Sequence, residues 1–253
     1  MTARHAMRTA GTGIAVSAGL AALGYAGLVA FNRVRYPRHT IAPSPGDGST
    51  LLDRFIPAPE VVEHHQVRIA APADVVLATA KGLELFNSRL VQAVFKLRTI
   101  ALGGRPDSRL RAKPLLEQMR SIGWVVLAER AGREMVLGAV TKPWEAEPVF
   151  RSISSGEFGA FREPGYVKIA WTLRAEPLDE WASVFHTETR VSTTDPETTK
   201  RFRRYWSYVA PGVELIRFAM LRPLKKAAER RADAATAVSS ARSADSVARA
   251  APP

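Results

Sequence analysis

The feature that most constrains the fold is a strand-like segment near the C-terminus that leads directly into a long amphipathic helix. Residues 181–191 form a strand-like run, and residues 192–195 end it. Asp195 is a suitable helix cap, and Pro196 and Glu197 are favoured in a first helical turn by backbone geometry and by the helix dipole. A last strand followed by a long closing helix predicts an α+β fold in which a helix lies across a sheet.

The closing helix is predicted from apolar side chains at steps of three and four: Phe202, Tyr205, Trp206, Val209, Val213, Ile216, Met220 and Leu224. This spacing keeps one face apolar for about six turns. Pro211 and Gly212 interrupt the pattern and predict a kink. Because the apolar face continues past them, we expect one bent helix that ends near Arg231. The Ala-, Ser- and Arg-rich residues 232–253 are expected to be a disordered tail.

Upstream of this helix, periodicity predicts antiparallel strands and short helices. The strands are expected at residues 61–70, 124–130, 134–141, 166–174 and 181–193. The helices are expected at residues 72–85, 88–100 and 114–122, with a further short helix within residues 153–161.

Two motifs resemble a known superfamily. The first is Val67-Arg-Ile-Ala-Ala-Pro-Ala-Asp-Val-Val76, a strand leading into a helix, and the second is His186-Thr-Glu-Thr-Arg-Val191 followed by Asp195 and Phe202-x-x-Tyr-Trp206. Together with the order of elements, they resemble the START/Bet v 1-like (SRPBCC) superfamily, of the polyketide cyclase/dehydrase and lipid-transport type, in a bacterial branch. The resemblance covers residues 61–231. It implies a helix-grip fold, with a curved antiparallel sheet wrapped on the kinked C-terminal helix and a hydrophobic cavity between them.

The implied cavity would be lined from both sides by apolar residues. The expected ligand-binding residues are Val167, Ile169, Trp171 and Leu173 on the sheet, and Tyr205, Trp206, Val209, Val213, Ile216 and Met220 on the helix. Concave apolar pockets with a few polar groups are the usual form of a small-molecule site. The alternative is a filled core that uses the same residues.

Three polar residues near the end of the last strand suggest a catalytic alternative. His186, Glu188 and Arg190 alternate, so a strand places them on one face. If that face lined the cavity, Glu188 would act as acid or base and Arg190 would hold an enolate or carboxylate. The competing interpretation is a solvated outer face with a weak ion pair, because the opposite face is more apolar.

No cofactor or metal site is predicted. The chain has no cysteine, which excludes disulfides, thiolate metal sites and a Cys nucleophile. His64 and His65 are adjacent and point to opposite faces of a strand, and a zinc site needs three or four converging ligands. The sequence contains neither a phosphate-binding loop nor a dinucleotide fingerprint.

The formal net charge of +12 predicts an anionic partner. Basic residues cluster at residues 105–113, 200–204 and 217–231. No nucleic-acid recognition motif accompanies them, so we expect an anionic membrane surface rather than nucleic acid. The alternative is that these residues are scattered, solvated surface charges.

The N-terminal region has the composition of a membrane anchor. Residues 9–31 contain no charged residue, and as a helix they are about 34 Å long, enough for a hydrocarbon core of about 30 Å. A signal peptide cleaved after Ala22-x-Gly24 is the competing interpretation. Residues 1–8 form a basic tail, and the Pro- and Gly-rich residues 32–60 form a linker.

The anchor also bears on orientation and assembly. Arginines flank it on both sides, and their slight excess after residue 31 favours a single-pass protein with a cytoplasmic globular domain. Alanines at every fourth position from Ala18 to Ala30 are suited to close helix packing and to a homodimer, although small residues are also common in membrane helices.

Three functions follow from these patterns. The first is a non-catalytic, membrane-anchored binding or transfer module for a lipid or other hydrophobic small molecule. The second is a cyclase- or dehydratase-like enzyme that uses Glu188 and Arg190. The third is a structural or interaction protein of the membrane surface with a filled core.

Overall fold

The computed structural model describes residues 51–105 and 113–250, and within them the strands form one antiparallel sheet. The strand order is β1-β6-β5-β3-β2, and β4 also pairs with β3. The strands are β1 (Val61–Ile69), β2 (Val125–Arg130), β3 (Glu134–Thr141), β4 (Phe150–Arg151), β5 (Val167–Pro177) and β6 (Ser183–Thr193). This arrangement confirms the predicted antiparallel sheet.

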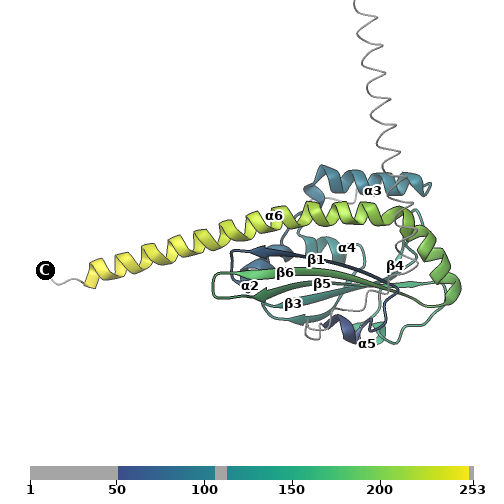
Figure 1. The fold of residues 1–253 in the computed structure, drawn as a ribbon, viewed down its shortest axis with the longest axis horizontal. Helices are drawn as coiled ribbons and strands as arrows, with labels where there is room; N and C mark the ends of the chain where they lie inside the picture. Colours follow the sequence, from purple (N-terminus) through teal and green to yellow (C-terminus); the bar gives the residue numbers. More distant parts are fainter. Residues whose placement is uncertain (1–50, 106–112, 251–253) are drawn as a thin grey trace, which may run out of the picture.

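The helices lie on both sides of this sheet (Figure 1). They are η1 (Leu51–Arg54), α2 (Ala73–Lys81), η2 (Leu85–Asn87), α3 (Arg89–Ala101), α4 (Leu115–Ser121), α5 (Ser155–Phe158) and α6 (Pro196–Ala250). Helix α6 runs across one face, and α3 lies beyond α6, whereas η1 and α5 lie against the opposite face. The sheet and its long C-terminal helix are consistent with the helix-grip architecture that the sequence implies.

Helix α6 begins at the predicted cap and is bent (Figure 1). The Asp195 carboxylate accepts hydrogen bonds from the backbone N–H of Thr198 at 2.8 Å and from that of Gly165 at 2.7 Å. These bonds and that of the Thr198 hydroxyl hold the pKa of Asp195 far below its ordinary value. Pro211 lies inside the helix, where its ring cannot donate the usual backbone hydrogen bond. We therefore attribute the bend to Pro211 and Gly212.

The C-terminal part of α6 differs from the expected disordered tail. The helix continues to Ala250, although Ala228 is its last buried side chain among those described. Residues 233–240 are exposed, so packing does not explain the helix. Alanine and arginine have high helix propensity, and extending an existing helix avoids the cost of nucleation.

The ordered body begins before the predicted domain boundary at Val61. Leu52, Phe55 and Ile56 are buried in an apolar cluster on the sheet face that is turned away from α6. Phe158 of α5 completes this cluster, with its ring 6.1 Å from that of Phe55. The last part of the expected linker therefore covers the sheet.

Within residues 51–105 and 113–250, no helix combines the length and apolar character needed to cross a bilayer. The transmembrane helix expected at residues 9–31 lies outside the described residues, as do the basic tail at residues 1–8 and the linker up to residue 50. The membrane anchor and its alanine stripe therefore stay predictions.

Candidate functional site

The register of the strands decides which side chains face α6. Trp171 on β5 pairs with Thr189 on β6 and with Leu137 on β3, and Thr189 pairs with Glu63 on β1. Residues paired in this way point to the same side of a sheet. The Trp171 ring contacts Arg217 of α6. We call this side the inner face and the opposite side the outer face.

The residues expected to line a cavity are largely packed against one another. Trp171, Leu173 and Met220 belong to one buried apolar cluster, whereas Val167 and Trp206 belong to a second. The remaining expected residues are half-buried: Ile169, Tyr205, Val209, Val213 and Ile216. At these positions the space between sheet and helix is filled by protein side chains.

A layer of polar side chains separates the two apolar clusters on the inner face. Along β6, Thr187 and Thr189 lie between Phe185 of the first cluster and Val191 of the second. Strand β1 likewise places two polar residues between its apolar ends. We call the following six residues the polar layer: Glu63, His65, Trp171, Thr187, Thr189 and Arg217.

Arg217 brings a positive charge into the polar layer. It is 8% exposed, and its guanidinium carbon lies 4.7 Å from the centre of the Trp171 ring. The guanidinium donates a hydrogen bond to the Thr189 hydroxyl. Burial lowers the pKa of Arg217 to about 10, although the negative charge of Glu63 opposes this effect. The lowered pKa means that the protein stabilises this charge less well than water does.

Trp171 and His65 bring nitrogen atoms into the same layer. The Trp171 indole donates a 2.6 Å hydrogen bond to the Thr187 hydroxyl. His65 Nε2 lies 3.8 Å from the nearer Glu63 oxygen, and its ring contacts Phe218 edge-on. Among the described residues, His65 Nε2 is buried without a hydrogen-bond partner. This nitrogen can therefore bind a polar atom of a ligand.

The polar layer is suited to holding an oxygen-bearing group. A guanidinium presents several N–H donors in a planar fork that matches carboxylates and phosphates. His65 and Glu63 are residue types that also transfer protons. No group of three His, Cys, Asp or Glu residues in the described part of the chain could hold a metal ion.

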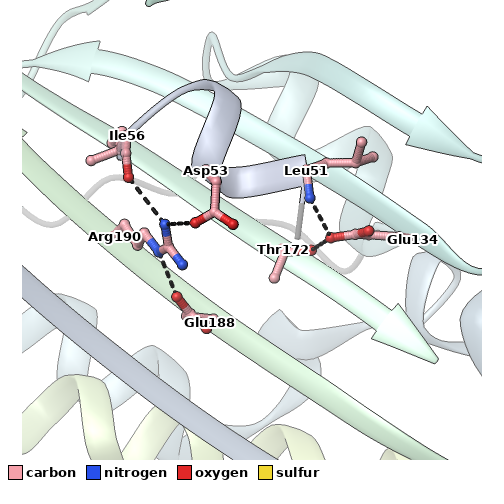
Figure 2. Close-up of polar contacts among 7 residues, drawn as sticks. All are labelled: Leu51, Asp53, Ile56, Glu134, Thr172, Glu188 and Arg190. Carbon is pink, nitrogen blue, oxygen red and sulfur yellow. Dashed lines mark hydrogen bonds and ion pairs between the residues drawn. The ribbon is translucent and has the colours of Figure 1, made fainter. Parts of the chain in front are cut away.

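On the outer face, Arg190 attaches the N-terminal segment to the sheet (Figure 2). Its guanidinium donates to Asp53 Oδ1 at 2.5 Å, to Glu188 Oε1 at 2.6 Å and to the carbonyl oxygen of Ile56 at 3.1 Å. Arg190 is 1% exposed. Burial alone would lower its pKa, but the hydrogen bonds and charges of Glu188 and Asp53 outweigh that effect and raise the pKa.

Glu134 makes a second attachment nearby (Figure 2). Its Oε1 atom accepts hydrogen bonds from the backbone N–H of Leu51 and from the Thr172 hydroxyl, both at 3.3 Å. Glu134 is 1% exposed. The start of η1 is thus held by a buried carboxylate, and its end is held by a buried guanidinium.

The residues of the catalytic alternative lie on the outer face. Glu188 pairs with Thr172, and His186 pairs with Arg174, so His186, Glu188 and Arg190 point away from α6. They have no access to the space between sheet and helix, which the acid–base hypothesis required. The other interpretation, a solvated face, is not correct for Arg190, because the N-terminal segment covers it.

Two hollows on the surface lie away from these residues. One is at the start of α6, beside Thr193, Asp195 and Lys200. The other lies between the end of α2 and the later part of α6, beside Gly82 and Arg230. Neither is lined by a residue expected to bind a ligand.

Sequence reasoning missed the polar layer, although two signals were present. Arg217 interrupts the apolar side of α6 between Ile216 and Met220. Glu63 and His65 share the alternating side of β1 with apolar residues, and they were assigned to a strand without a role. The layer becomes apparent only when the pairing of β1 with β6 is known.

No protein-family model matches the sequence, and no curated protein sequence matches it significantly. Among solved structures, the Zhui aromatase/cyclase from Streptomyces sp. R1128 is 15% identical to this chain. The alignment covers 68% of this chain and 94% of the cyclase chain, with a TM-score of 0.26.

Norcoclaurine synthase from Thalictrum flavum is similar to this chain at the same level. A point mutant with a transition-state analogue is 12% identical over 64% of this chain and 94% of its own, with a TM-score of 0.23. The structure of its complex with dopamine and hydroxybenzaldehyde is also 12% identical. That alignment covers 73% of this chain and 97% of the synthase chain, with a TM-score of 0.22. Both enzymes have Bet v 1-like folds. Similarity this low is no basis for assigning an activity, and the helix-grip description rests on the sheet order and α6.

Proposed function

We propose that this protein is a binding module for a hydrophobic small molecule or lipid that carries an acidic group. The ligand is held between the sheet and α6, with its apolar part against the two inner-face clusters. The supporting observation is the polar layer, above all Arg217, at a place where an ordinary core contains only apolar side chains.

The charge of Arg217 supports an anionic or strongly polar ligand group. Burial of a cation is costly unless hydrogen bonds and opposite charge compensate for it. The lowered pKa of Arg217 indicates that Glu63 and Thr189 compensate only in part. A carboxylate or phosphate oxygen placed beside Arg217 and His65 would add the missing compensation, so the site binds such a group in preference to an uncharged one.

The test compares two fluorescent probes, a polyene fatty acid and its methyl ester, on the chain without residues 1–40. We expect the acid to bind, and Arg217→Met to weaken its binding about tenfold or more, because a hydrogen bond to a charged group is lost. The ester should bind both proteins equally.

The matched control is Arg222→Met, which removes an exposed arginine from the same helix. The Arg222→Met variant should bind the acid with the same affinity as the unmodified chain. Circular dichroism should report the same helix content for the unmodified chain and for both variants. Failure of both probes to bind the folded, unmodified protein would refute the proposal.

A second candidate is a structural or interaction protein, which the third sequence-based hypothesis describes. The observation in its favour is that expected lining residues are packed within apolar clusters, Trp171 and Met220 in the first and Trp206 in the second. Binding in this space requires those side chains to move apart. The same probe titration decides between the two candidates, because a permanently filled core takes up neither probe.

The location of the protein is also part of the proposal. The uncharged residues 9–31 support a single membrane-spanning anchor, and the net charge of +12 supports contact with an anionic membrane surface. A lipid ligand would then be present in the membrane next to the binding site.

A further inference from the structure

Helix α3 has an exposed apolar stripe along its length. Leu90, Leu97 and Ile100 are 44%, 67% and 58% exposed. Residues three, four or seven positions apart share a side of a helix, so these three side chains form one row together with the exposed Ala93. We call this row the α3 stripe. An exposed apolar row of this length is unusual on the surface of a short helix in water.

The opposite side of α3 is already used to hold the helix in place. Val91 is fully buried, and the Phe95 ring lies 5.3 Å from the ring of Phe86. Val94 lies against Gly212 of α6, where a glycine allows close approach. The α3 stripe is therefore a second apolar surface on a helix whose first apolar surface is satisfied.

Basic residues flank the stripe, and α3 has no acidic residue. At 3.6 residues per turn, the exposed Arg89 and Lys96 border one side of the stripe. Arg98 instead shares the packed side of α3 with the buried Val91, and it donates hydrogen bonds to the Tyr205 hydroxyl and to the carbonyl oxygens of Pro143 and Glu145. The basic residues available to a partner of the stripe are therefore Arg89 and Lys96.

The position of α3 makes the stripe accessible. Figure 1 shows α3 on the side of α6 that faces away from the sheet, as the outermost of the described helices there. An apolar row bordered by basic residues on such a helix has the pattern of helices that lie in the interface of an anionic bilayer.

We propose that α3 is a membrane-docking helix that inserts the α3 stripe into the interface of an anionic bilayer, while Arg89 and Lys96 contact lipid phosphates. The inference concerns a surface separate from the polar layer and does not depend on the identity of any ligand. It assigns the membrane contact to one element, which net charge alone cannot do.

The charges favour a bilayer over two other occupants. A second copy of this chain, docked stripe to stripe with the two helices antiparallel, would place basic residues against basic residues. The chain's own residues 9–31 carry no charge and would leave the flanking arginine and lysine without a counter-charge. Anionic lipid satisfies both the apolar row and its basic border.

The experiment uses the full chain, which has no cysteine, with Ala93→Cys labelled by an environment-sensitive fluorophore. The labelled protein is incorporated into phosphatidylcholine vesicles with and without phosphatidylglycerol. We expect blue-shifted emission that rises about threefold or more with the anionic lipid and is quenched by nitroxide-labelled lipid. A second labelled protein, Leu178→Cys, reports an exposed apolar position in the β5–β6 turn and should not respond.

Three variants made in the Ala93→Cys protein separate the contributions. Leu97→Ser should abolish most of the blue shift in anionic vesicles, whereas Leu178→Ser should leave it unchanged. Replacement of Arg89 and Lys96 by Gln should remove the increase caused by phosphatidylglycerol. No blue shift in anionic vesicles overturns the proposal. A blue shift in anionic vesicles that nitroxide-labelled lipid does not quench also overturns it and identifies the chain itself or a second copy as the occupant.

Discussion

At the scale of single residues, two buried arginines on opposite faces of one sheet differ in how their charges are compensated. Arg190 contacts the carboxylates of Asp53 and Glu188, and its pKa is raised. The pKa of Arg217 is lowered to about 10. The first arginine therefore holds parts of the chain together, whereas the second carries a charge that the fold alone stabilises poorly.

Loss of Arg190 should destabilise the protein more than loss of an exposed ion-pair arginine. Arg190→Met leaves two carboxylates and the Ile56 carbonyl without their donor, and we expect the free energy of unfolding to fall by about 2–3 kcal/mol. Arg151→Met, which removes an exposed pair with Glu163, should cost less than about 1 kcal/mol. Urea unfolding of both variants measures the difference. Equal costs would show that Arg190 does not hold η1 on the sheet.

At the scale of elements, the contact between α3 and α6 depends on Gly212. A Cβ atom at this position would lie 2.9 Å from Val94 Cγ1. Gly212→Ala gains about 1 kcal/mol of helix propensity, but we expect the crowding to outweigh this gain and to give a net loss of about 1 kcal/mol.

Removal of the crowding group should reverse this loss. Val94→Ala should cost about 1 kcal/mol less in the Gly212→Ala background than in the unmodified chain, which a double-mutant cycle measures by chemical unfolding. Gly156→Ala, at a position with open space around it, is the control. Stabilisation by Gly212→Ala alone would mean that the two helices do not pack closely there.

Several elements could be predicted from the sequence because their signals are local. The alternation around Trp171 predicted β5, and Asp195 and Pro196 predicted the start of α6. The polar layer could not be predicted in this way, since Thr189 and Glu63 meet only through the pairing of β1 with β6. The continuation of α6 beyond Arg231 was missed, because the absence of large apolar residues was read as disorder although alanine alone favours a helix.

At the scale of the whole molecule, the proposed anchor makes a prediction about sides of the membrane. Ala237→Cys places one thiol on an exposed part of α6 in a chain without cysteine. If the globular part is cytoplasmic, a membrane-impermeant thiol reagent should label this residue only after the cells are permeabilised. Labelling of intact cells would place the domain on the other side.

The attachment of residues 51–56 to the outer face also determines how the molecule bears mechanical load. Besides the apolar packing of Leu52, Phe55 and Ile56, any pull on the chain upstream of Leu51 reaches the sheet through two polar contacts, with the Glu134 carboxylate on β3 and the Arg190 guanidinium on β6. Two strands that are not neighbours, with β5 between them, therefore share the tension. An N-terminal segment attached in this way pulls on the middle of the sheet and places no direct load on the edge strand β1.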